Sequence, residues 1–333
     1  MASTELLESF KFDPKFAGLD IFQANYKQVG DHGIRVDVFV PKTPSANKRP
    51  IFVRFHGGGL VMGDSLYKDF WPQWLSDLAL QKNAIVISPN YRLMPQATGL
   101  DIYDDIEDFW AWVLSGAVNE LLTKHGSTEA DLSRILVGGE SAGGLLSVNS
   151  ALAHAADIRA AVATYPSVDP TAADFVVPRS PDRLPFGQHV PASVVEERLA
   201  EDSTVPVSSA ISPKEFPFML AMVEYGHYGE WYVRGSEGPR QNLLFPERRL
   251  EEPDVKVPAG GITIIQGRQD SIVPAHHSEP FVARAREVLK GKPGGDKIAF
   301  IVKDGEHGFD VELKYEEPWL KEALQTAVDA WLA

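Results

Sequence analysis

The chain has 333 residues, of which 44% are hydrophobic and 23% are charged, fractions that are ordinary for a soluble globular protein. Its formal net charge of −14 argues against nucleic acid or an anionic membrane as a partner, because binding to phosphate requires a basic patch. The chain has no cysteine, which excludes disulfides, thiolate metal sites and cysteine nucleophiles.

The N-terminal sequence, MASTELLESFKFDPKF, lacks the basic and apolar segments of a secretory signal peptide. No apolar run is long enough to cross a bilayer, and the C-terminal residues carry no retention or peroxisomal address. These features predict a cytoplasmic protein with no membrane insertion.

Short apolar runs rich in β-branched residues, bounded by Gly, Pro or Asn, predict buried strands. Helical spacing of apolar residues recurs between them. The predicted strands are residues 34–40, 50–56, 84–89, 134–138, 160–165, 261–266 and 298–303. The predicted helices are residues 67–80, 101–114, 142–155, 276–289 and 318–332. This alternation is typical of an α/β protein whose parallel sheet is covered by helices on both faces.

The alternation stops from about residue 169 to residue 258, where Pro, Glu and aromatic residues are frequent and no run indicates a buried strand. A structureless loop of that length is uncommon in a compact domain, so we expect helices within it. We interpret residues 1–30 and 169–258 as a cap over the active site. Residues 31–168 and 259–333 then form the catalytic core.

The sequence His56-Gly57-Gly58-Gly59 follows the strand predicted at residues 50–56. Acyl transfer builds negative charge on a carbonyl oxygen, and glycines can turn backbone amides towards that charge. We expect the amides of Gly57 and Gly58, together with that of Ala142, to form an oxyanion hole. The alternative is a plain flexible turn.

A second glycine motif, Gly139-Glu140-Ser141-Ala142-Gly143-Gly144, lies between a predicted strand and a predicted helix. Gly-x-Ser-x-Gly in this context is typical of a nucleophile elbow, a strained turn that places the serine at a helix N-terminus. The motif alone is weak evidence, and its context supports the interpretation. A phosphate-binding loop is disfavoured, because no Lys-Ser/Thr pair follows and Gly-x-Gly-x-x-Gly is absent.

A serine hydroxyl is a poor nucleophile at neutral pH, so a base must take its proton and an acid must orient the base. The chain order in this arrangement is nucleophile, acid, histidine. Asp270 follows the strand predicted at 261–266, and His307 follows the one at 298–303. The sequence therefore predicts Ser141 as nucleophile, Asp270 as acid and His307 as base.

No cofactor and no metal are expected. The pair His276-His277 lacks the His-Glu-x-x-His spacing of helical zinc sites, and no other cluster of His and carboxylates has ligand spacing. We expect this pair to be exposed on the surface.

The two glycine motifs resemble those of the hormone-sensitive lipase-like branch of the α/β hydrolases, over most of the chain from about Arg35. Residues 56–64, HGGGLVMGD, are similar to its oxyanion loop. Residues 91–96, YRLMPQ, are similar to its Tyr-Arg-Leu-Ala-Pro-Glu segment. The resemblance implies an α/β-hydrolase fold with an eight-stranded, mostly parallel sheet and a helical cap formed by the N-terminus and an insertion. It also implies esterase activity without a cofactor, on short to medium acyl chains.

The sequence departs from that branch in two places. Met94 and Gln96 replace the usual Ala and Glu, and we expect altered packing there. The residues around Asp270, QDSIVP, are closer to the general α/β-hydrolase form than to the Asp-x-x-Arg-Asp pattern of the branch. Hydrolases of fungal secondary metabolism are similar at this length, an analogy that suggests a natural-product ester.

These features predict a serine carboxylic ester hydrolase that acts through an acyl-enzyme on a small or medium, apolar or natural-product ester. An acyltransferase and a lyase or dehydratase are alternatives on the same scaffold, and the presence of His307 disfavours a non-catalytic ligand-binding receptor. The expected partner is a small-molecule ester, and whether the chain forms a homodimer is left open. The candidate substrate-binding residues are aromatic side chains of the insertion: Phe216, Tyr225, Tyr228 and Trp231.

Overall fold

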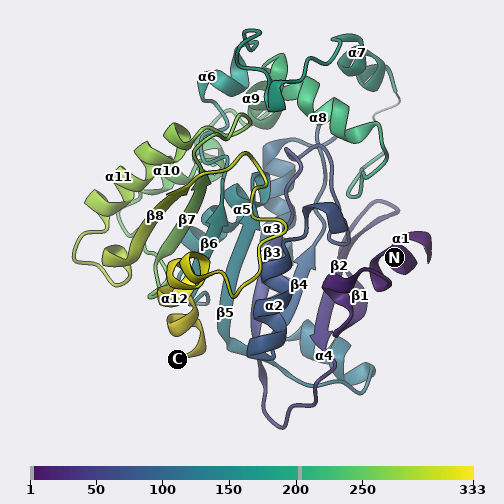
Figure 1. Cartoon of the computed structure of the whole chain (residues 1–333), viewed down its shortest axis with the longest axis vertical. Coiled ribbons are helices and arrows are strands. Elements are labelled where there is room, and N and C mark those ends of the chain that lie inside the picture. The colour runs from purple at the N-terminus through teal and green to yellow at the C-terminus, as the bar shows by residue number, and fades with distance from the viewer. Residues whose placement is uncertain (1–3, 202–204) are drawn as a thin grey trace.

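The computed structural model describes residues 4–201 and 205–333. One sheet of eight strands crosses the molecule in the order β1-β2-β4-β3-β5-β6-β7-β8 (Figure 1). The pairs β1–β2 and β2–β4 are antiparallel, and every other neighbouring pair is parallel. This mixed, mostly parallel sheet is the one that the sequence predicted.

Seven of the eight strands coincide with the predicted apolar runs, and only β1 was not predicted. The strands are β1 (Leu19–Val29), β2 (His32–Pro41), β3 (Arg49–Phe55), β4 (Ile85–Pro89), β5 (Ala130–Glu140), β6 (Ala160–Thr164), β7 (Ile262–Gly267) and β8 (Ile298–Lys303).

The α-helices connect and cover the strands. They are α1 (Thr4–Lys11), α2 (Gln73–Lys82), α3 (Gly99–Leu114), α4 (Ala117–Lys124), α5 (Ala142–Ala153), α6 (Ala173–Val176), α7 (Ser193–Ala200), α8 (Glu215–Glu224), α9 (His227–Val233), α10 (Pro246–Arg249), α11 (Ser278–Val288) and α12 (Pro318–Leu332). The short 3-10 helices are η1 (Pro14–Phe16), η2 (Lys68–Phe70), η3 (Pro185–Gly187), η4 (Pro239–Leu244), η5 (Ala275–His277) and η6 (Gly295–Lys297). In the part of the chain that the structure describes, no helix combines the length and apolarity needed to cross a membrane.

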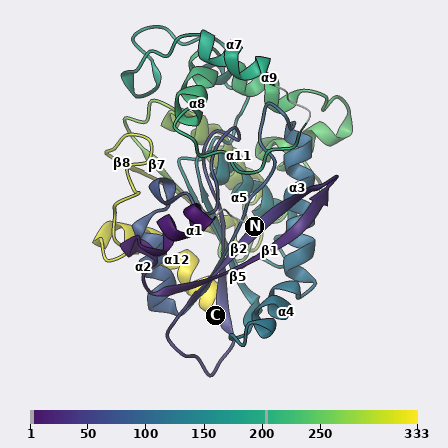
Figure 2. The same cartoon turned by 90° about the vertical axis from the view of Figure 1, so that its right-hand side faces the viewer.

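Helices pack on both faces of the sheet, and Figure 2 separates α2 and α12 on one side from α3 and α4 on the other. Successive side chains of a strand point to opposite faces, so each central strand supplies two cores. In β3, Ile51 and Val53 belong to the core under α3 and α5, whereas Phe52 belongs to the core under α2 and α12. Burial on both faces explains why these strands read as continuous apolar runs.

Residues 19–29 correct the predicted cap. We assigned them to it, but they form β1, the edge strand, which pairs with β2 from Leu19↔Pro41 to Val29↔His32. The preceding α1 also packs on the core, because the Phe10 ring lies 5.4 Å from that of Phe39 in β2. The prediction that residues 1–30 cover the site is therefore wrong for these elements, while residues 1–3 lie outside the described residues.

The second predicted cap segment, residues 169–258, begins with four helices, α6 to α9, which lie together over one end of the sheet at the top of Figure 1. Further along, α10 contacts α5 and α11 of the core. The described residues of this segment, 169–201 and 205–258, contribute no strand to the sheet. We call residues 169–258 the cap below, and its boundaries stay a prediction.

Candidate active site

A cavity of about 300 Å³ is lined by loops that follow β3, β5, β6, β7 and β8 and by side chains of the cap. Ser141 and His307 both line it, together with Gly57 and Gly58. Most of the other lining side chains are apolar: Phe70, Phe175, Phe186, Phe216, Met219, Val223, Ile272, Val273 and Val311. The structure thus brings most of the predicted site residues to one apolar cavity.

Ser141 occupies a strained turn between β5 and α5. Its φ of 56° and ψ of −118° lie in a region that residues with side chains seldom adopt. The turn is tightly enclosed, since a Cβ atom on Gly143 would lie 2.0 Å from the carbonyl oxygen of Phe55. A Cβ atom on Gly139 would lie 2.3 Å from the carbonyl oxygen of Gly143. Both motif glycines are therefore required by the close approach of backbone.

The residue between Gly139 and Ser141 anchors the turn to the sheet. Glu140 is buried, and its carboxylate accepts hydrogen bonds from Nε (3.1 Å) and Nη2 (3.0 Å) of Arg54 in β3. The Arg54 guanidinium also lies 4.6 Å from the centre of the Trp71 ring. Burial raises the pKa of Glu140 to about 7, although Arg54 opposes this shift.

Asp270 and His307 are joined by a hydrogen bond of 2.9 Å from the histidine Nδ1 to the carboxylate Oδ2. The same carboxylate accepts the amides of Ile272 at 2.9 Å and Val273 at 2.8 Å, and the side-chain amide of Gln266 at 3.2 Å. Four donors therefore satisfy a carboxylate that is wholly buried. Because Nδ1 donates to Asp270, Nε2 of the neutral ring is free to accept a proton.

Ser141 and His307 reach the cavity from separate loops. Between these two described residues, the structure has no hydrogen bond from the serine hydroxyl to the ring. Such bonds are often long in a site without substrate and shorten when substrate binds. The catalytic roles of Ser141, Asp270 and His307 stay predictions, for which the structure supplies the common location and the oriented ring.

A second buried carboxylate, Asp310, lies three residues after His307 but is fully engaged elsewhere. Its Oδ1 accepts the Tyr165 hydroxyl at 2.6 Å and its Oδ2 accepts the Trp74 indole at 2.9 Å. Burial raises the pKa of Asp310. The centre of the Tyr165 ring lies 4.5 Å from that of the His307 ring. Asp310 therefore supports His307 indirectly, through Tyr165, whereas Asp270 accepts a hydrogen bond from it directly.

The three expected oxyanion donors are unpaired in the part of the chain that the structure describes. The amides of Gly57 and Gly58 donate no backbone hydrogen bond there. Ala142 is the first residue of α5, so its amide has no acceptor in the preceding turn of the helix. The φ of 111° at Gly58 is one that favours glycine. Their role as donors stays a prediction.

The side chain of His56 holds the glycine loop in place through a hydrogen bond and ring stacking. Its Nδ1 donates to the carbonyl of Gly57 at 2.8 Å, and its ring stacks on Tyr91 with centres 4.4 Å apart. The Tyr91 hydroxyl donates back to the His56 carbonyl at 2.6 Å. Complete burial lowers the pKa of His56 to about 4. A Cβ atom on Gly63 would lie 2.5 Å from the His56 ring, so Gly63 is a requirement of the same packing.

The cap binds this loop through backbone. Gly63 and Ala210 exchange two hydrogen bonds, of 2.8 and 3.0 Å, in an isolated antiparallel bridge. The amide of Leu93 donates to the carbonyl of Val207 at 2.8 Å. The segment that resembles Tyr-Arg-Leu-Ala-Pro-Glu therefore lies between the oxyanion loop and the cap.

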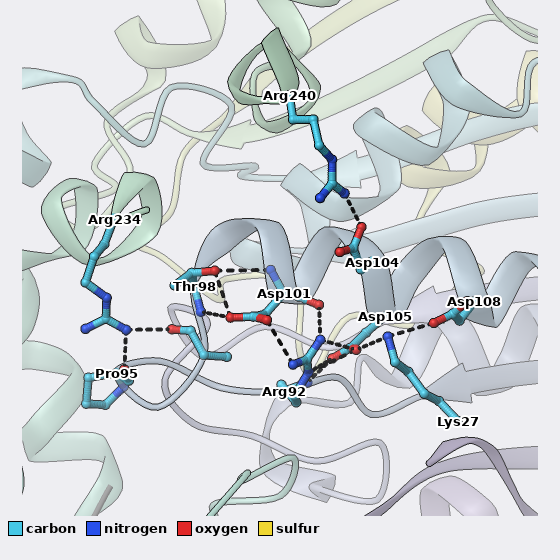
Figure 3. Close-up of polar contacts among 11 residues, drawn as sticks. Lys27, Arg92, Pro95, Thr98, Asp101, Asp104, Asp105, Asp108, Arg234 and Arg240 are labelled. Carbon is cyan, nitrogen blue, oxygen red and sulfur yellow. Dashed lines mark hydrogen bonds and ion pairs between the residues drawn. The ribbon is translucent and has the colours of Figure 1, made fainter. Parts of the chain in front are cut away.

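A network of charges extends this support to α3 (Figure 3). Arg92 donates to Asp105, which also pairs with Lys27 of β1 at 2.8 Å. From the cap, Arg234 donates to the carbonyl of Pro95 at 2.6 Å. Further pairs in the view are Arg92 with Asp101, Lys27 with Asp108 and Arg240 with Asp104.

The four predicted substrate-binding aromatics divide into two groups. Phe216 and Tyr228 line the cavity, whereas Tyr225 and Trp231 do not. The Tyr225 hydroxyl donates to the carbonyl of Val190 at 2.9 Å, and the Trp231 ring stacks on Phe218 at 5.8 Å. These two side chains hold the cap together, which corrects their assignment.

Several cavity residues were not predicted. Phe70 lies in η2, after β3 in the chain, whereas the others belong to the cap. Phe175 lies in α6, Phe186 lies in η3, and Met219 and Val223 lie on α8. The aromatic content of the cap was a sequence signal for Phe175 and Phe186, but it does not say which rings face inward, and no signal indicated the other three.

Asp174, His276 and His277 are the only trio of potential metal ligands found among the described residues. Asp174 already accepts from Arg183 at 2.6 Å and from His277 at 2.9 Å. A guanidinium beside the carboxylate opposes cation binding, so the trio fits an ion-pair cluster better than a metal site. His277 is buried, which corrects the expectation of an exposed histidine pair.

Known proteins of similar sequence are described as α/β hydrolases or probable carboxylesterases. A family profile described as an α/β-hydrolase fold matches residues 52–189. The probable carboxylesterase M8 of Phoma sp. is 30% identical over 334 residues, covering 97% of this chain and 99% of that protein. The probable carboxylesterase clz11 of Cochliobolus lunatus is 40% identical over 200 residues, covering 57% of this chain and 86% of that protein.

Solved structures share the fold at low sequence identity. A Staphylococcus aureus protein of unknown function superposes with a TM-score of 0.62 at 17% identity, covering 93% of this chain and 98% of that one. Esterase B of Lactobacillus rhamnosis superposes with a TM-score of 0.58 at 16% identity, covering 99% of this chain and 96% of that one. At these identities the likeness concerns the fold alone.

The buried His56 predicts a dependence of stability on pH. Because its pKa is about 4 in the folded protein and about 6.5 when unfolded, the unfolded chain takes up a proton first as pH falls. Above pH 6.5 the His56 ring is neutral in both states and has no effect on this balance. As the pH falls from 6.5 to 4, the free energy of unfolding decreases by about 3 kcal/mol in total.

Urea unfolding between pH 7.5 and pH 4 measures this contribution. His56→Gln should show a shallower loss of unfolding free energy than the wild type over that range, whereas the exposed His125→Gln should follow the wild type. Parallel curves for the wild type and His56→Gln would contradict the assignment.

Proposed function

The chain belongs to the α/β-hydrolase fold family, and from that premise we propose that it is a carboxylesterase which cleaves an uncharged ester through an acyl-enzyme on Ser141. The observation that carries this proposal is the hydrogen bond of 2.9 Å from His307 to Asp270, together with the cavity that His307 and Ser141 both line. A carboxylate, an oriented imidazole and a serine at a strained turn are the parts that acyl transfer requires.

The proposed reaction has two halves. In the first, Nε2 of His307 takes the proton of the Ser141 hydroxyl while its oxygen bonds to the ester carbonyl carbon. The tetrahedral intermediate collapses, the carbon–oxygen bond to the alcohol breaks, and His307 gives the proton to the leaving alcohol. In the second half, His307 deprotonates a water that attacks the acyl-enzyme, and Ser141 regains the proton as the acid leaves.

Charge in this reaction develops at two places that the site can stabilise. The carbonyl oxygen becomes negative, and the amides of Gly57, Gly58 and Ala142 are the proposed donors to it, each worth about 10²–10³ in rate. The His307 ring becomes positive, and the buried Asp270 carboxylate stabilises it and keeps the proton on Nδ1 between steps.

The cavity supports a small or medium apolar ester. Its volume of about 300 Å³ lies at the lower end of the roughly 300–1,000 Å³ that small-molecule pockets span. Phenylalanine, methionine and valine side chains dominate its lining, so apolar or aromatic acyl and alcohol groups would be desolvated there at little cost. Asp69 at the exposed side of the lining disfavours substrates that carry a carboxylate.

A pair of hydroxyl groups adds a further polar feature to this lining. The hydroxyls of Ser167 and Tyr228 lie 3.1 Å apart, and both residues are buried. Two hydroxyls carry two protons, and their mutual hydrogen bond uses only one. We propose that the remaining O–H donates to a second oxygen of the substrate, such as an ether, hydroxyl or carbonyl oxygen at a fixed distance from the ester.

The acyl-enzyme route predicts that Ser141→Ala lowers kcat/KM for p-nitrophenyl esters by at least about 10⁴-fold, because the nucleophile is lost. The optimum acyl chain should fall between butanoate and octanoate, given the cavity volume. Hydrolysis is followed by nitrophenolate release from acetate to dodecanoate, with identification of the free acid as product. The exposed Ser133→Ala serves as the matched control and should retain full activity. A Ser141→Ala enzyme that still turns over these esters would refute the route.

The hydroxyl pair predicts a preference for esters with a correctly placed second oxygen. A series of p-nitrophenyl hexanoates with one methylene replaced by an ether oxygen is compared with hexanoate itself. The ratio of the two kcat/KM values should be about tenfold higher for the wild type than for the Ser167→Ala/Tyr228→Phe double variant at one oxygen position. Intrinsic reactivity cancels in this comparison.

Tyr103→Phe, which removes a half-buried hydroxyl outside the cavity lining, should give the wild-type ratios. Equal ratios for the wild type and the double variant at every oxygen position would remove the hydroxyl pair from substrate recognition.

A further inference from the structure

The turn that carries Asp270 is bound from both sides. On one side, the amides of Ile272 and Val273 donate to the Asp270 carboxylate at 2.9 and 2.8 Å. On the other side, the carbonyls of Ser271 and Ile272 accept from Nη1 and Nη2 of Arg179, at 3.1 and 3.0 Å. Arg179 belongs to the cap, in the segment between α6 and α7.

The same two peptide groups make both sets of hydrogen bonds. The peptide of Ser271 and Ile272 joins the first carbonyl to the first amide, and the peptide of Ile272 and Val273 joins the second pair. In a planar trans peptide the carbonyl and the amide point in opposite directions. Each peptide therefore has the Arg179 guanidinium at its oxygen and the Asp270 carboxylate at its amide hydrogen.

This arrangement aligns the charges with the peptide dipoles. A cation at the carbonyl oxygen and an anion at the amide hydrogen polarise the peptide in the same sense, which strengthens both hydrogen bonds. Burial increases the effect, because the side chains of Arg179 and Asp270 are 3% and 0% exposed. Two parallel chains of hydrogen bonds thus connect the cap cation to the carboxylate that holds His307.

The cap fixes Arg179 independently of the turn. Its Nε donates to the carbonyl of Asp174 at 2.8 Å, and its own amide donates to the carbonyl of Glu224 at 2.7 Å. A second cap contact holds the same turn, since the amide of Phe186 donates to the Ser271 hydroxyl at 2.8 Å. The guanidinium is therefore held in position before substrate binds.

The histidine loop is tied to this turn as well. One oxygen of Glu306 accepts the amide of Ser271 at 2.6 Å and the amide of His307 at 2.8 Å. A displacement of the turn would therefore move both the acid and the base of the proposed triad.

We propose that Arg179 is a positioning residue for the reaction, which acts on His307 through the turn 271–273 and Asp270. It holds the turn in the conformation that presents the carboxylate to Nδ1, and it stabilises the charge of that carboxylate while the imidazolium forms. The inference rests on the proposed function, because it requires the Asp270–His307 pair to be catalytic. It gives the cap a part in the chemistry in addition to lining the cavity.

Arg179→Met and Arg179→Lys test this role by steady-state kinetics on the best p-nitrophenyl ester. We expect Arg179→Met to lower kcat by about 10- to 100-fold with KM changed less than about threefold, because hydrogen bonds to a charged group are lost. Arg179→Lys keeps the charge but loses the two-carbonyl fork, and should recover part of kcat.

Arg183→Gln is the matched control. Its side chain is 51% exposed and donates to Asp174 in the same cluster, but it makes no hydrogen bond to the turn. We expect its kcat to stay within about threefold of the wild type. A loss of kcat as large as that of Arg179→Met would assign the effect to the cluster and overturn the proposal.

A double-mutant cycle with Asp270→Asn separates positioning from a merely structural role. If Arg179 acts through Asp270, Arg179→Met should cause less than about a threefold further loss in the Asp270→Asn background. The same fold loss in both backgrounds would mean that Arg179 only holds the cap, and would overturn the proposal. If Arg179→Met does not fold, as judged by its thermal midpoint, the cycle is run with Arg179→Lys.

The single variants at Asp270 and Arg179 distinguish failure of the proposed triad from failure of the proposed role of Arg179. An Asp270→Asn enzyme with wild-type kcat would overturn the proposed triad and with it the role of Arg179. An Asp270→Asn enzyme that loses activity, combined with Arg179 variants that retain full kcat, would overturn only the role of Arg179.

Discussion

The close contact between β3, β5 and the first turn of α5 is the constraint on which the rest of the site depends. Ser141 is held at φ 56°, a conformation that costs about 1–3 kcal/mol and persists only when its surroundings enforce it. Those surroundings are the carbonyl of Phe55, which leaves no room for a side chain on Gly143, and the buried Arg54–Glu140 pair beneath the turn. A buried pair of this kind adds little net stability, but loss of either partner leaves an uncompensated charge, so it fixes one geometry.

Backbone groups of the loops at the site take part in its polar contacts together with side chains. The buried Asp270 carboxylate takes two of its four donors from the turn that follows it, and His56 donates to the carbonyl of the next residue. Backbone donors are fixed by the fold and lose no side-chain freedom when they bind. A site built in this way is organised before substrate arrives, which is the condition for electrostatic stabilisation of a transition state.

The sequence predicted the parts of this protein that are determined locally. Strands buried on both faces read as apolar runs, and the motifs around Gly57, Ser141, Asp270 and His307 follow such runs directly. The edge strand β1 was missed because polar residues interrupt its apolar ones, so it has no continuous apolar run, and these polar residues find partners only in the folded chain, as Lys27 does with Asp105. The cavity-facing rings were partly missed because the cap helices are short, and aromatic content does not separate Tyr228, which faces the cavity, from Trp231, which does not. Arg179 has no motif at all, because it recognises carbonyls that every residue carries.

The contacts of the cap limit how substrate can reach the cavity. The cap is bonded to the oxyanion loop through Gly63 and Ala210, and to the acid turn through Arg179. A rigid opening of the cap would break both sets of hydrogen bonds and would disturb the proposed oxyanion donors and the triad acid together. An open cap would therefore be an inactive one, and entry by movement of rim side chains such as Phe186 would leave both loops in place. The contacts that would set the shape of the closed cap, and with it the choice of substrate, are thus the same contacts that hold the loops of the proposed catalytic groups in place.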